Sequence, residues 1–244
     1  MKKHNFSAGP AILPQEVLQQ AAAAVQELDG IGLSLIEISH RSKEFVAIME
    51  EAQQLALRLL GLENKGYRAL FLQGGASLQF LMVAYNLLEH KAGYLNTGTW
   101  STKAIKEAQL FGEVEELASS KDKNFSYIPK DYAISSDLDY IHLTTNNTIF
   151  GTQIKELPVA EAPLVADMSS DIFSWNMDYS KFDLLYAGAQ KNMGPAGTTL
   201  VVVKESILGK VSRSIPAMLD YLVHLDKDSM FNTPPVFAVY TSLL

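Results

Sequence analysis

The sequence predicts an α/β fold in which a mainly parallel sheet is flanked by helices. Short apolar runs that are typical of buried strands alternate with longer stretches in which apolar residues recur at helical spacing. Polar residues gather directly after several of these strands, as they do where ligands bind at the carboxyl edge of a parallel sheet. These two patterns also indicate where a functional site should be sought.

Length and composition narrow the function classes. The 244 residues suffice for one large domain or two modest ones, and the net charge of −7 argues against nucleic acid as the main partner. The chain has no cysteine, so we expect neither disulfides nor a thiolate metal site, and no metal. The N-terminus is polar and no apolar run approaches the length of a membrane span, which predicts a cytoplasmic protein without membrane contact.

The first third of the chain should be mostly helical. Pro14 suits the first turn of a helix whose apolar residues end before Gly30. Ser42 can cap a second helix that runs to Leu59, and residues 34–38 between them look extended. We predict an irregular N-terminal segment over residues 1–14 and one cofactor-binding domain over residues 15–244.

Strands and helices alternate in the remainder. Helices are expected after Ser77, from Ser101 through Phe111 and over residues 237–244, and the polar residues 119–137 should form a surface loop. The expected strands are residues 67–72, 93–96, 114–117, 140–145, 164–166, 183–186 and 199–204.

Residues 186–197 lie between two of these strands and contain one lysine, Lys191, in a loop of small residues. Glycine and alanine leave room for a flat ligand, and Gly194-Pro195 forces a turn. A lysine in such a place can form a Schiff base with an aldehyde if its surroundings lower its pKa. A lone lysine in a turn is more often simply exposed, so other features must decide.

Three further features point to one cofactor. Asp167 closes a strand, Gly75-Ala76-Ser77 follows another strand and opens a helix whose free N–H groups suit a phosphate, and Trp100 offers a flat face. Taken singly, each has a plainer explanation: a helix cap, a tight turn and a packing tryptophan. Together with Lys191 they fit pyridoxal 5′-phosphate, which has an aldehyde, a ring nitrogen, a phosphate and a flat ring.

At this point the chain resembles the phosphoserine aminotransferase family, a class V, fold-type I family of pyridoxal phosphate enzymes. The matching segments occur in order across nearly the whole chain, and the one around the lysine is long and specific. They are residues 6–10 (FSAGP), 39–42 (SHRS), 73–75 (QGG), 167–170 (DMSS), 188–197 (GAQKNMGPAG) and 232–235 (NTPP).

The resemblance implies a homodimer that transfers an amino group between L-glutamate and 3-phosphohydroxypyruvate. The products are O-phospho-L-serine and 2-oxoglutarate, a step of serine biosynthesis, and the family also serves pyridoxal phosphate biosynthesis in some bacteria. The substrates and products are all small molecules.

The resemblance also assigns roles by position. Lys191 would hold the cofactor and shuttle the substrate proton, and Asp167 would pair with the ring nitrogen. His40 and Arg41 would bind an anionic group of the substrate. The remaining cofactor contacts would come from Trp100 on the ring, Thr148 on its phenolic oxygen, Gln190 and the amides of Ala76 and Ser77 on the phosphate, and Asn232 and Thr233 on the phosphate of the neighbouring subunit.

The chain departs from the family pattern in three places. Leu78 follows Ser77 where members often have glycine. Some members carry arginine at the Ser77 position itself, so the phosphate seat of this chain is expected to be less basic than theirs. Asn147 precedes Thr148 where glutamate is common. Members also continue into a smaller C-terminal domain that supplies an arginine for the substrate carboxylate, whereas this chain ends at Leu244. We therefore expect cofactor binding to survive, transamination to be impaired, and apolar surface near Phe237 to be exposed.

Three alternatives remain open. The chain could be another fold-type I aminotransferase or a lyase. It could be a phosphate-binding domain in which Lys191 is only structural. In this 244-residue form it could also be a pyridoxal phosphate-binding dimer with little turnover.

Overall fold

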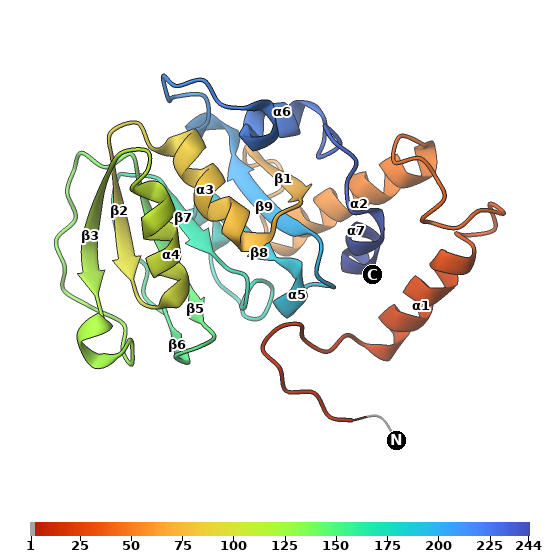
Figure 1. The fold of residues 1–244 in the computed structure, drawn as a ribbon, viewed down its shortest axis with the longest axis horizontal. Helices are drawn as coiled ribbons and strands as arrows, with labels where there is room; N and C mark the ends of the chain where they lie inside the picture. The colour runs from red at the N-terminus through yellow and green to blue at the C-terminus, as the bar shows by residue number, and fades with distance from the viewer. Residues whose placement is uncertain (1–2) are drawn as a thin grey trace.

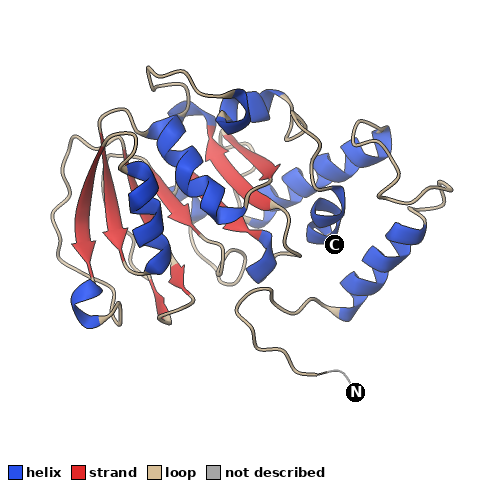
Figure 2. Cartoon of the chain, in the orientation of Figure 1, coloured by secondary structure: helices blue, strands red, loops and turns tan. Residues whose placement is uncertain are grey.

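A single seven-stranded sheet organises the computed structural model, which describes residues 3–244 (Figures 1 and 2). Its strand order is β1-β9-β8-β7-β4-β2-β3, and β5 and β6 form a separate two-stranded hairpin. The strands are β1 (Tyr67–Leu72), β2 (Lys91–Asn96), β3 (Glu113–Ser119), β4 (Tyr140–Thr144), β5 (Asn146–Asn147), β6 (Thr152–Gln153), β7 (Leu164–Asp167), β8 (Leu184–Gly188) and β9 (Thr199–Lys204).

The sheet is mainly parallel, as predicted, with one reversal. Only β9 runs against its neighbours, β8 and β1, while the other pairs of this sheet are parallel. The register brings the carboxyl ends of β1 and β8 beside the first residue of β9, because Leu72 and Gly188 both pair with Thr199. Thr144 pairs with Asp167 at the same edge. The glycine turn, the lysine segment and Asp167 therefore leave the sheet together.

Helices cover both faces of the sheet and make two cores. One core joins α1, α2 and α7 to sheet residues such as Phe71, Leu143 and Val202, and the other joins α3, α4 and α6 to residues such as Leu72 and Val201. Alternate residues of β9 thus face opposite cores, as strand geometry requires. The helices are α1 (Gln15–Gln26), α2 (Lys43–Leu59), α3 (Gly75–Leu87), α4 (Thr99–Ala108), α5 (Ala189–Asn192), α6 (Tyr221–Asp226) and α7 (Val236–Leu243), with short 3₁₀ turns at 121–123, 179–181, 205–207 and 217–219.

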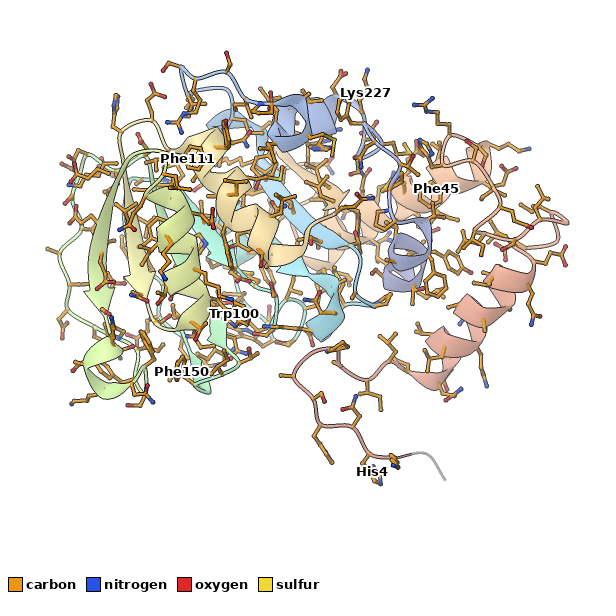
Figure 3. The ribbon with its side chains drawn as sticks, viewed as in Figure 1. His4, Phe45, Trp100, Phe111, Phe150 and Lys227 are labelled. Atoms are coloured by element: carbon orange, nitrogen blue, oxygen red, sulfur yellow. The ribbon has the colours of Figure 1, made fainter. Side chains whose placement is uncertain are left out.

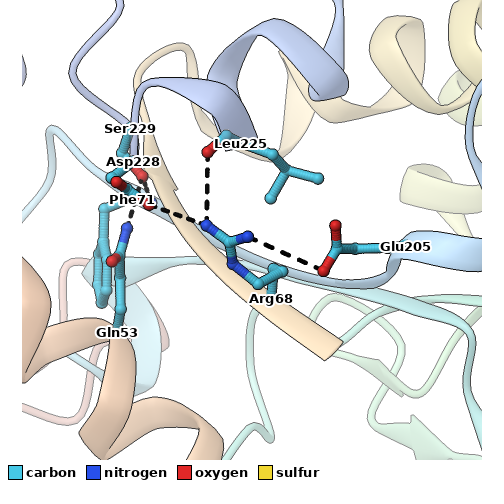
Figure 4. Close-up of polar contacts among 7 residues, drawn as sticks. All are labelled: Gln53, Arg68, Phe71, Glu205, Leu225, Asp228 and Ser229. Carbon is cyan, nitrogen blue, oxygen red and sulfur yellow. Dashed lines mark hydrogen bonds and ion pairs between the residues drawn. The ribbon is translucent and has the colours of Figure 1, made fainter. Parts of the chain in front are cut away.

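A polar cluster fastens the segment after α6 to the edge strand β1 (Figure 4). The Ser229 hydroxyl accepts from the Phe71 amide at 3.0 Å and from Gln53 of α2 at 3.2 Å. Arg68 reaches Asp228 at 2.8 Å and the Leu225 carbonyl at 3.4 Å, and its other nitrogen lies 3.8 Å from Glu205. These contacts fix the path of the chain just before Asn232 and Thr233.

Several local expectations are confirmed and others are wrong. Ser42 caps α2 by accepting from the Phe45 amide, and all seven expected strands exist. Residues 34–38 are not extended, because Ser34 and Glu37 bond to each other through side chain and backbone and close a turn. The lysine segment includes one helical turn, α5, rather than an open loop, and α4 ends at Ala108 instead of Phe111.

Two further observations concern the extent of the chain. Among the described residues, no helix has the length and apolar character that crossing a bilayer requires. Residues 3–14 contain no helix or strand, and residues 1–2 of the predicted N-terminal segment lie outside the described part. The division of the chain at residue 14 stays a prediction.

Candidate active site

Lys191 projects from α5, a single helical turn at the carboxyl end of β8. The Ala189 carbonyl closes this turn by accepting from the amides of Met193 and Gly194 at 3.1 and 2.8 Å. The Ala189 amide in turn donates to the Thr198 carbonyl at 3.1 Å. Backbone hydrogen bonds therefore join the residues before Lys191 to those after it, and also to Thr198, which precedes β9.

The Lys191 ammonium group lies against polar and aromatic partners from two other elements. Its Nζ donates to the Thr148 hydroxyl at 3.2 Å and lies 5.1 Å from the centre of the Trp100 ring. Burial lowers the pKa of Lys191, and the Asp167 carboxylate opposes that shift. A lysine with a lowered pKa is unprotonated more often near neutral pH, which an amine nucleophile or base requires.

The N-terminal segment packs onto the stem of the same lysine. A Cβ atom placed on Gly9 would lie 2.8 Å from Lys191 Cγ, closer than real Cβ contacts come. The Ala11 amide donates to the Gln190 carbonyl at 2.9 Å. A groove of about 520 Å³ runs beside this contact, lined by residues 11–14, by Lys191 to Gly194 and by the end of α7.

Asp167 is the buried anion of the site. It ends β7, is only 4% exposed, and accepts the amide and hydroxyl of Ser169 on Oδ1 at 3.0 and 2.6 Å. Burial raises the pKa of Asp167, while the Ser169 bonds and the charge of Lys191 lower it. Because both bonds go to Oδ1, Oδ2 is left for a further donor such as a protonated ring nitrogen.

Trp100 occupies the second position of α4, where the helix starts against the β5–β6 hairpin. Figure 3 shows Trp100 and Phe150 of the hairpin at the lower end of α4. A Cβ on Gly98 would lie 2.7 Å from Asn147 Oδ1, so helix and hairpin are in close contact. The indole Nε1 is buried and has no hydrogen-bond partner among residues 3–244, and Lys103 Nζ lies 4.8 Å from the ring centre.

The glycine turn before α3 has the backbone of an anion seat. Gly74 and Gly75 adopt φ values of 92° and 67°, which L-residues with a side chain rarely adopt. The first intrahelical bond runs from the Leu78 amide to the Gly74 carbonyl, so the amides of Gly75, Ala76 and Ser77 precede the hydrogen-bond ladder. Three free donors at the positive end of a helix favour a phosphate.

Asn232 and Thr233 lie beside this turn. Asn232 Nδ2 donates to Gln73 Oε1 at 3.3 Å, and Gln73 Nε2 donates to the Thr233 carbonyl at 2.8 Å. Both residues were predicted to reach the phosphate of a neighbouring subunit. Within one chain they contact the residue that precedes its own glycine turn.

His40 and Arg41 are not brought to the lysine. They lie in the loop between α1 and α2, which Figure 1 places at the right side of the molecule, beyond α7 from α5. Arg41 is exposed and its backbone amide donates to the Ser39 hydroxyl at 3.2 Å. Lys191 thus contacts Thr148 and Trp100 and is coupled by charge to Asp167, whereas the loop that carries His40 and Arg41 lies apart from them.

The sequence patterns assigned no role to three residues that the structure places at the site. Ser169 orients Asp167, Gly9 makes room for the lysine stem, and Asp171 bonds to the Thr145 hydroxyl at 2.5 Å. A serine two residues after an aspartate is a recognisable turn signal, so Ser169 could have been found. Gly9 and Asp171 act across long sequence separations that no local pattern reveals.

The two other large cavities do not contain the predicted residues. One of about 520 Å³ is lined by Lys155, Trp175 and the start of β7, and a neighbouring one of about 610 Å³ shares Lys155. Leu164, which opens β7, lines the first, so this cavity lies toward the opposite edge of the sheet from Asp167. The residues that line these two cavities do not include Lys191, Asp167, Trp100 or Thr148.

Comparison with known proteins identifies the family. The class-V aminotransferase family model matches residues 3–243. The chain is 67% identical to the phosphoserine aminotransferase of Flavobacterium johnsoniae and 59% identical to that of Parabacteroides distasonis; both alignments cover all of this chain, and 69% and 68% of those proteins.

Solved structures agree. The phosphoserine aminotransferase of Bacillus circulans subsp. alkalophilus superposes with a TM-score of 0.94 at 44% identity, over 98% of this chain and 67% of that one. The pyridoxal phosphate-bound enzyme of Trichomonas vaginalis gives 0.91 at 34% identity, over 99% and 69%. The chain therefore belongs to the class-V aminotransferases, and within them to the phosphoserine aminotransferase family.

Proposed function

We propose that Lys191 and its neighbours Thr148, Trp100 and Asp167, here called the Lys191 cluster, form the cofactor site of a phosphoserine aminotransferase. The observation that carries this proposal is the position of Lys191 Nζ, half-buried, 5.1 Å from the Trp100 ring centre and 3.2 Å from the Thr148 hydroxyl. Pyridoxal phosphate needs one polar group at its aldehyde and one at its ring nitrogen. The Lys191 amine, whose pKa is lowered by burial, suits the aldehyde, and the buried Asp167 carboxylate suits the ring nitrogen.

The residues present fit this cofactor. Trp100 offers a ring face, its buried Nε1 has no protein acceptor, and Asp167 keeps Oδ2 for a donor. The free amides of Ala76 and Ser77 suit a phosphate, with Gln190 as a further donor. Thr148 would hold the phenolic oxygen, and Asn232 and Thr233 would extend the phosphate seat of a second subunit.

When bound, pyridoxal phosphate withdraws electrons from the substrate Cα and so makes its hydrogen acidic. Asp167 would stabilise positive charge at the ring nitrogen, which a buried carboxylate does more strongly than an exposed one. Lys191 Nζ would hold the cofactor aldehyde and then take the proton from the substrate Cα as a general base.

The reaction is transfer of an amino group between L-glutamate and 3-phosphohydroxypyruvate, which yields O-phospho-L-serine and 2-oxoglutarate in serine biosynthesis. His40 and Arg41 are proposed to bind an anionic group of these small-molecule substrates, since a guanidinium fork fits phosphate and carboxylate. A contribution to pyridoxal phosphate biosynthesis and a cytoplasmic location are also proposed.

A homodimer with shared sites is proposed from the predicted reach of Asn232 and Thr233 to a neighbouring phosphate. Mixing Lys191→Ala chains with Asn232→Ala chains tests it. A shared site predicts partial recovery of activity in the mixture, because one hybrid site then has both wild-type residues. Activity that stays at the level of the separate variants would contradict the shared site.

The first test of the cofactor site is chemical. The protein is mixed with pyridoxal phosphate, reduced with borohydride, digested and analysed by mass spectrometry. We expect one pyridoxyl tag, on Lys191. Tags scattered over surface lysines, or none, would support a phosphate-binding domain with a structural lysine instead. A tag at Lys191 without phosphoserine formation would support a cofactor-binding dimer with little turnover, and activity with unphosphorylated hydroxypyruvate would indicate another aminotransferase.

A further inference from the structure

The β5–β6 hairpin carries Thr148 but is too short to hold itself in place. Its two strands pair at only two positions, Asn146 with Gln153 and Asn147 with Thr152. Two-stranded hairpins are marginally stable in water even when longer. Ile149 at the tip is 58% exposed, so burial of the tip does not anchor it. Contacts outside the hairpin therefore hold Thr148 next to Lys191. Asn147 Nδ2 donates to the Thr97 hydroxyl at 3.2 Å and Phe150 packs on Phe125, and further contacts hold the base of the hairpin.

The turn after β7 supplies those contacts. Asp171 accepts from the Thr145 hydroxyl at 2.5 Å on Oδ1 and from Gln153 Nε2 at 3.2 Å on Oδ2. One carboxyl group therefore bonds to the residue that enters the hairpin and to the residue that leaves it. Ser170 adds a reciprocal pair with Asn146, at 2.9 Å in each direction.

Burial makes these bonds matter. Asp171 is 4% exposed and Thr145 is fully buried, so neither group can exchange its partner for water. Burial raises the pKa of the Asp171 carboxyl, and the bonds from Thr145 and Gln153 oppose that shift. Loss of the carboxyl would leave the Thr145 hydroxyl with only its other acceptor, the Asp167 carbonyl at 3.1 Å, and would remove the Asp171 contact of Gln153, so the hairpin would lose both side-chain links to Asp171.

We propose that Asp171 is a positioning residue that clamps both ends of the β5–β6 hairpin and thereby keeps the Thr148 hydroxyl within hydrogen-bond distance of Lys191 Nζ. Asp171 does not touch the lysine itself. The part of this inference that concerns Thr148 and Lys191 rests on the proposed function, whereas the clamp on the hairpin does not.

The clamp is tested by hydrogen–deuterium exchange on the 244-residue chain without added cofactor. Asp171→Ala should speed exchange in peptides that cover residues 145–154 by about tenfold, because one buried and one partly buried contact are lost. Peptides from β9 should be unchanged. Asp171→Asn, which keeps an acceptor for Thr145, should restore most of the protection. Asp122→Ala, which removes an exposed bond to Tyr127, is the matched control and should change nothing in the hairpin.

Exchange in residues 145–154 that is equal in Asp171→Ala and wild type would overturn the clamp. If Asp171→Ala does not fold, Thr145→Val replaces it, since that change removes the hydroxyl that donates to Asp171, together with its 3.1 Å contact to the Asp167 carbonyl, and leaves the carboxyl in place. Hairpin protection that is unaffected by Thr145→Val would then count against the proposal.

The link to the lysine is tested by acylation of Lys191 with a limiting amount of anhydride, followed by mass spectrometry over a range of pH. Asp171→Ala should change the rate in the same direction as Thr148→Val, and the double variant should add nothing to Thr148→Val alone. Additive effects would show that Asp171 acts on Lys191 by another route. Neither experiment needs the cofactor, so failure of the borohydride test leaves both readable.

Discussion

Lys191 and Arg41 are both cations predicted to meet the substrate, yet the fold holds them in opposite ways. Lys191 leaves a short turn between two paired strands and touches residues of α4, the β5–β6 hairpin and the N-terminal segment. Arg41 is exposed in a loop between two helices. The group that needs a shifted pKa is surrounded by several elements, and the group that needs only charge and reach is left in solvent. We expect substitutions at the two positions to differ accordingly.

The largest effect should come from Lys191→Ala. This change removes both the amine that would hold the cofactor and the general base, so phosphoserine formation should fall by about 10³-fold. The borohydride tag should vanish while circular dichroism stays that of the wild type. A variant that keeps a tenth of the wild-type rate would place the chemistry elsewhere.

Asp167→Asn should have the next largest effect and should change the pH profile. The Asp167 carboxylate raises the pKa of Lys191 against the effect of burial, so its removal should lower that pKa further. The pH midpoint of Lys191 acylation should therefore move down. An upward or absent shift, measured by peptide mass spectrometry, would contradict the coupling. Asp122→Ala, far along the sequence and exposed, serves as control.

Arg41→Gln should leave the Lys191 cluster intact and weaken only the binding of the substrate. We expect KM for the phosphorylated substrate to rise by about tenfold, the size of one lost charge-assisted contact. The borohydride tag and the melting temperature should be unchanged, because Arg41 is exposed. Steady-state kinetics with phosphorylated and plain hydroxypyruvate show whether Arg41 binds the phosphate group. An equal loss on both substrates would show that it does not.

The smallest effect is expected from Gly9→Ala. The new Cβ would lie 2.8 Å from Lys191 Cγ, and the lysine stem must shift to admit it. Overpacking of this kind costs about 1 kcal/mol, and we expect a several-fold loss of activity with a modest drop in melting temperature. Ser7→Ala, an exposed change two residues away, should be silent. If Gly9→Ala were silent too, the N-terminal segment would not lie on the lysine in solution.

Sequence patterns predicted the parts of this molecule that depend on local chemistry. The seven strands, the Ser42 cap and the helix after the glycine turn follow from apolar spacing and capping residues. The reversal of β9 could not be predicted, because a buried apolar strand looks the same in either direction. The turn at residues 34–38 was missed because its apolar residues resemble a strand, while a Ser34–Glu37 contact decides the conformation.

The candidate site divides in the same way. Lys191, Asp167 and Trp100 could be proposed from residue type and from their positions after strands, and the structure brings Lys191 close to Trp100 and to Thr148. Asp171 could not be proposed, because its role depends on Thr145 and Gln153, which lie 26 and 18 residues away in the chain. Nothing in the local sequence distinguishes it from a surface aspartate in a turn.

The pairing of Gly188 with Thr199 has a mechanical consequence. The lysine segment is a loop whose two ends are paired neighbours where β8 ends and β9 begins. As long as β8 and β9 stay paired, the ends of this segment cannot separate, and we expect the Lys191 amine to move mainly by rotation about its own side-chain bonds. We expect larger opening or closing of the site to come from parts of the protein that this strand pairing does not fasten.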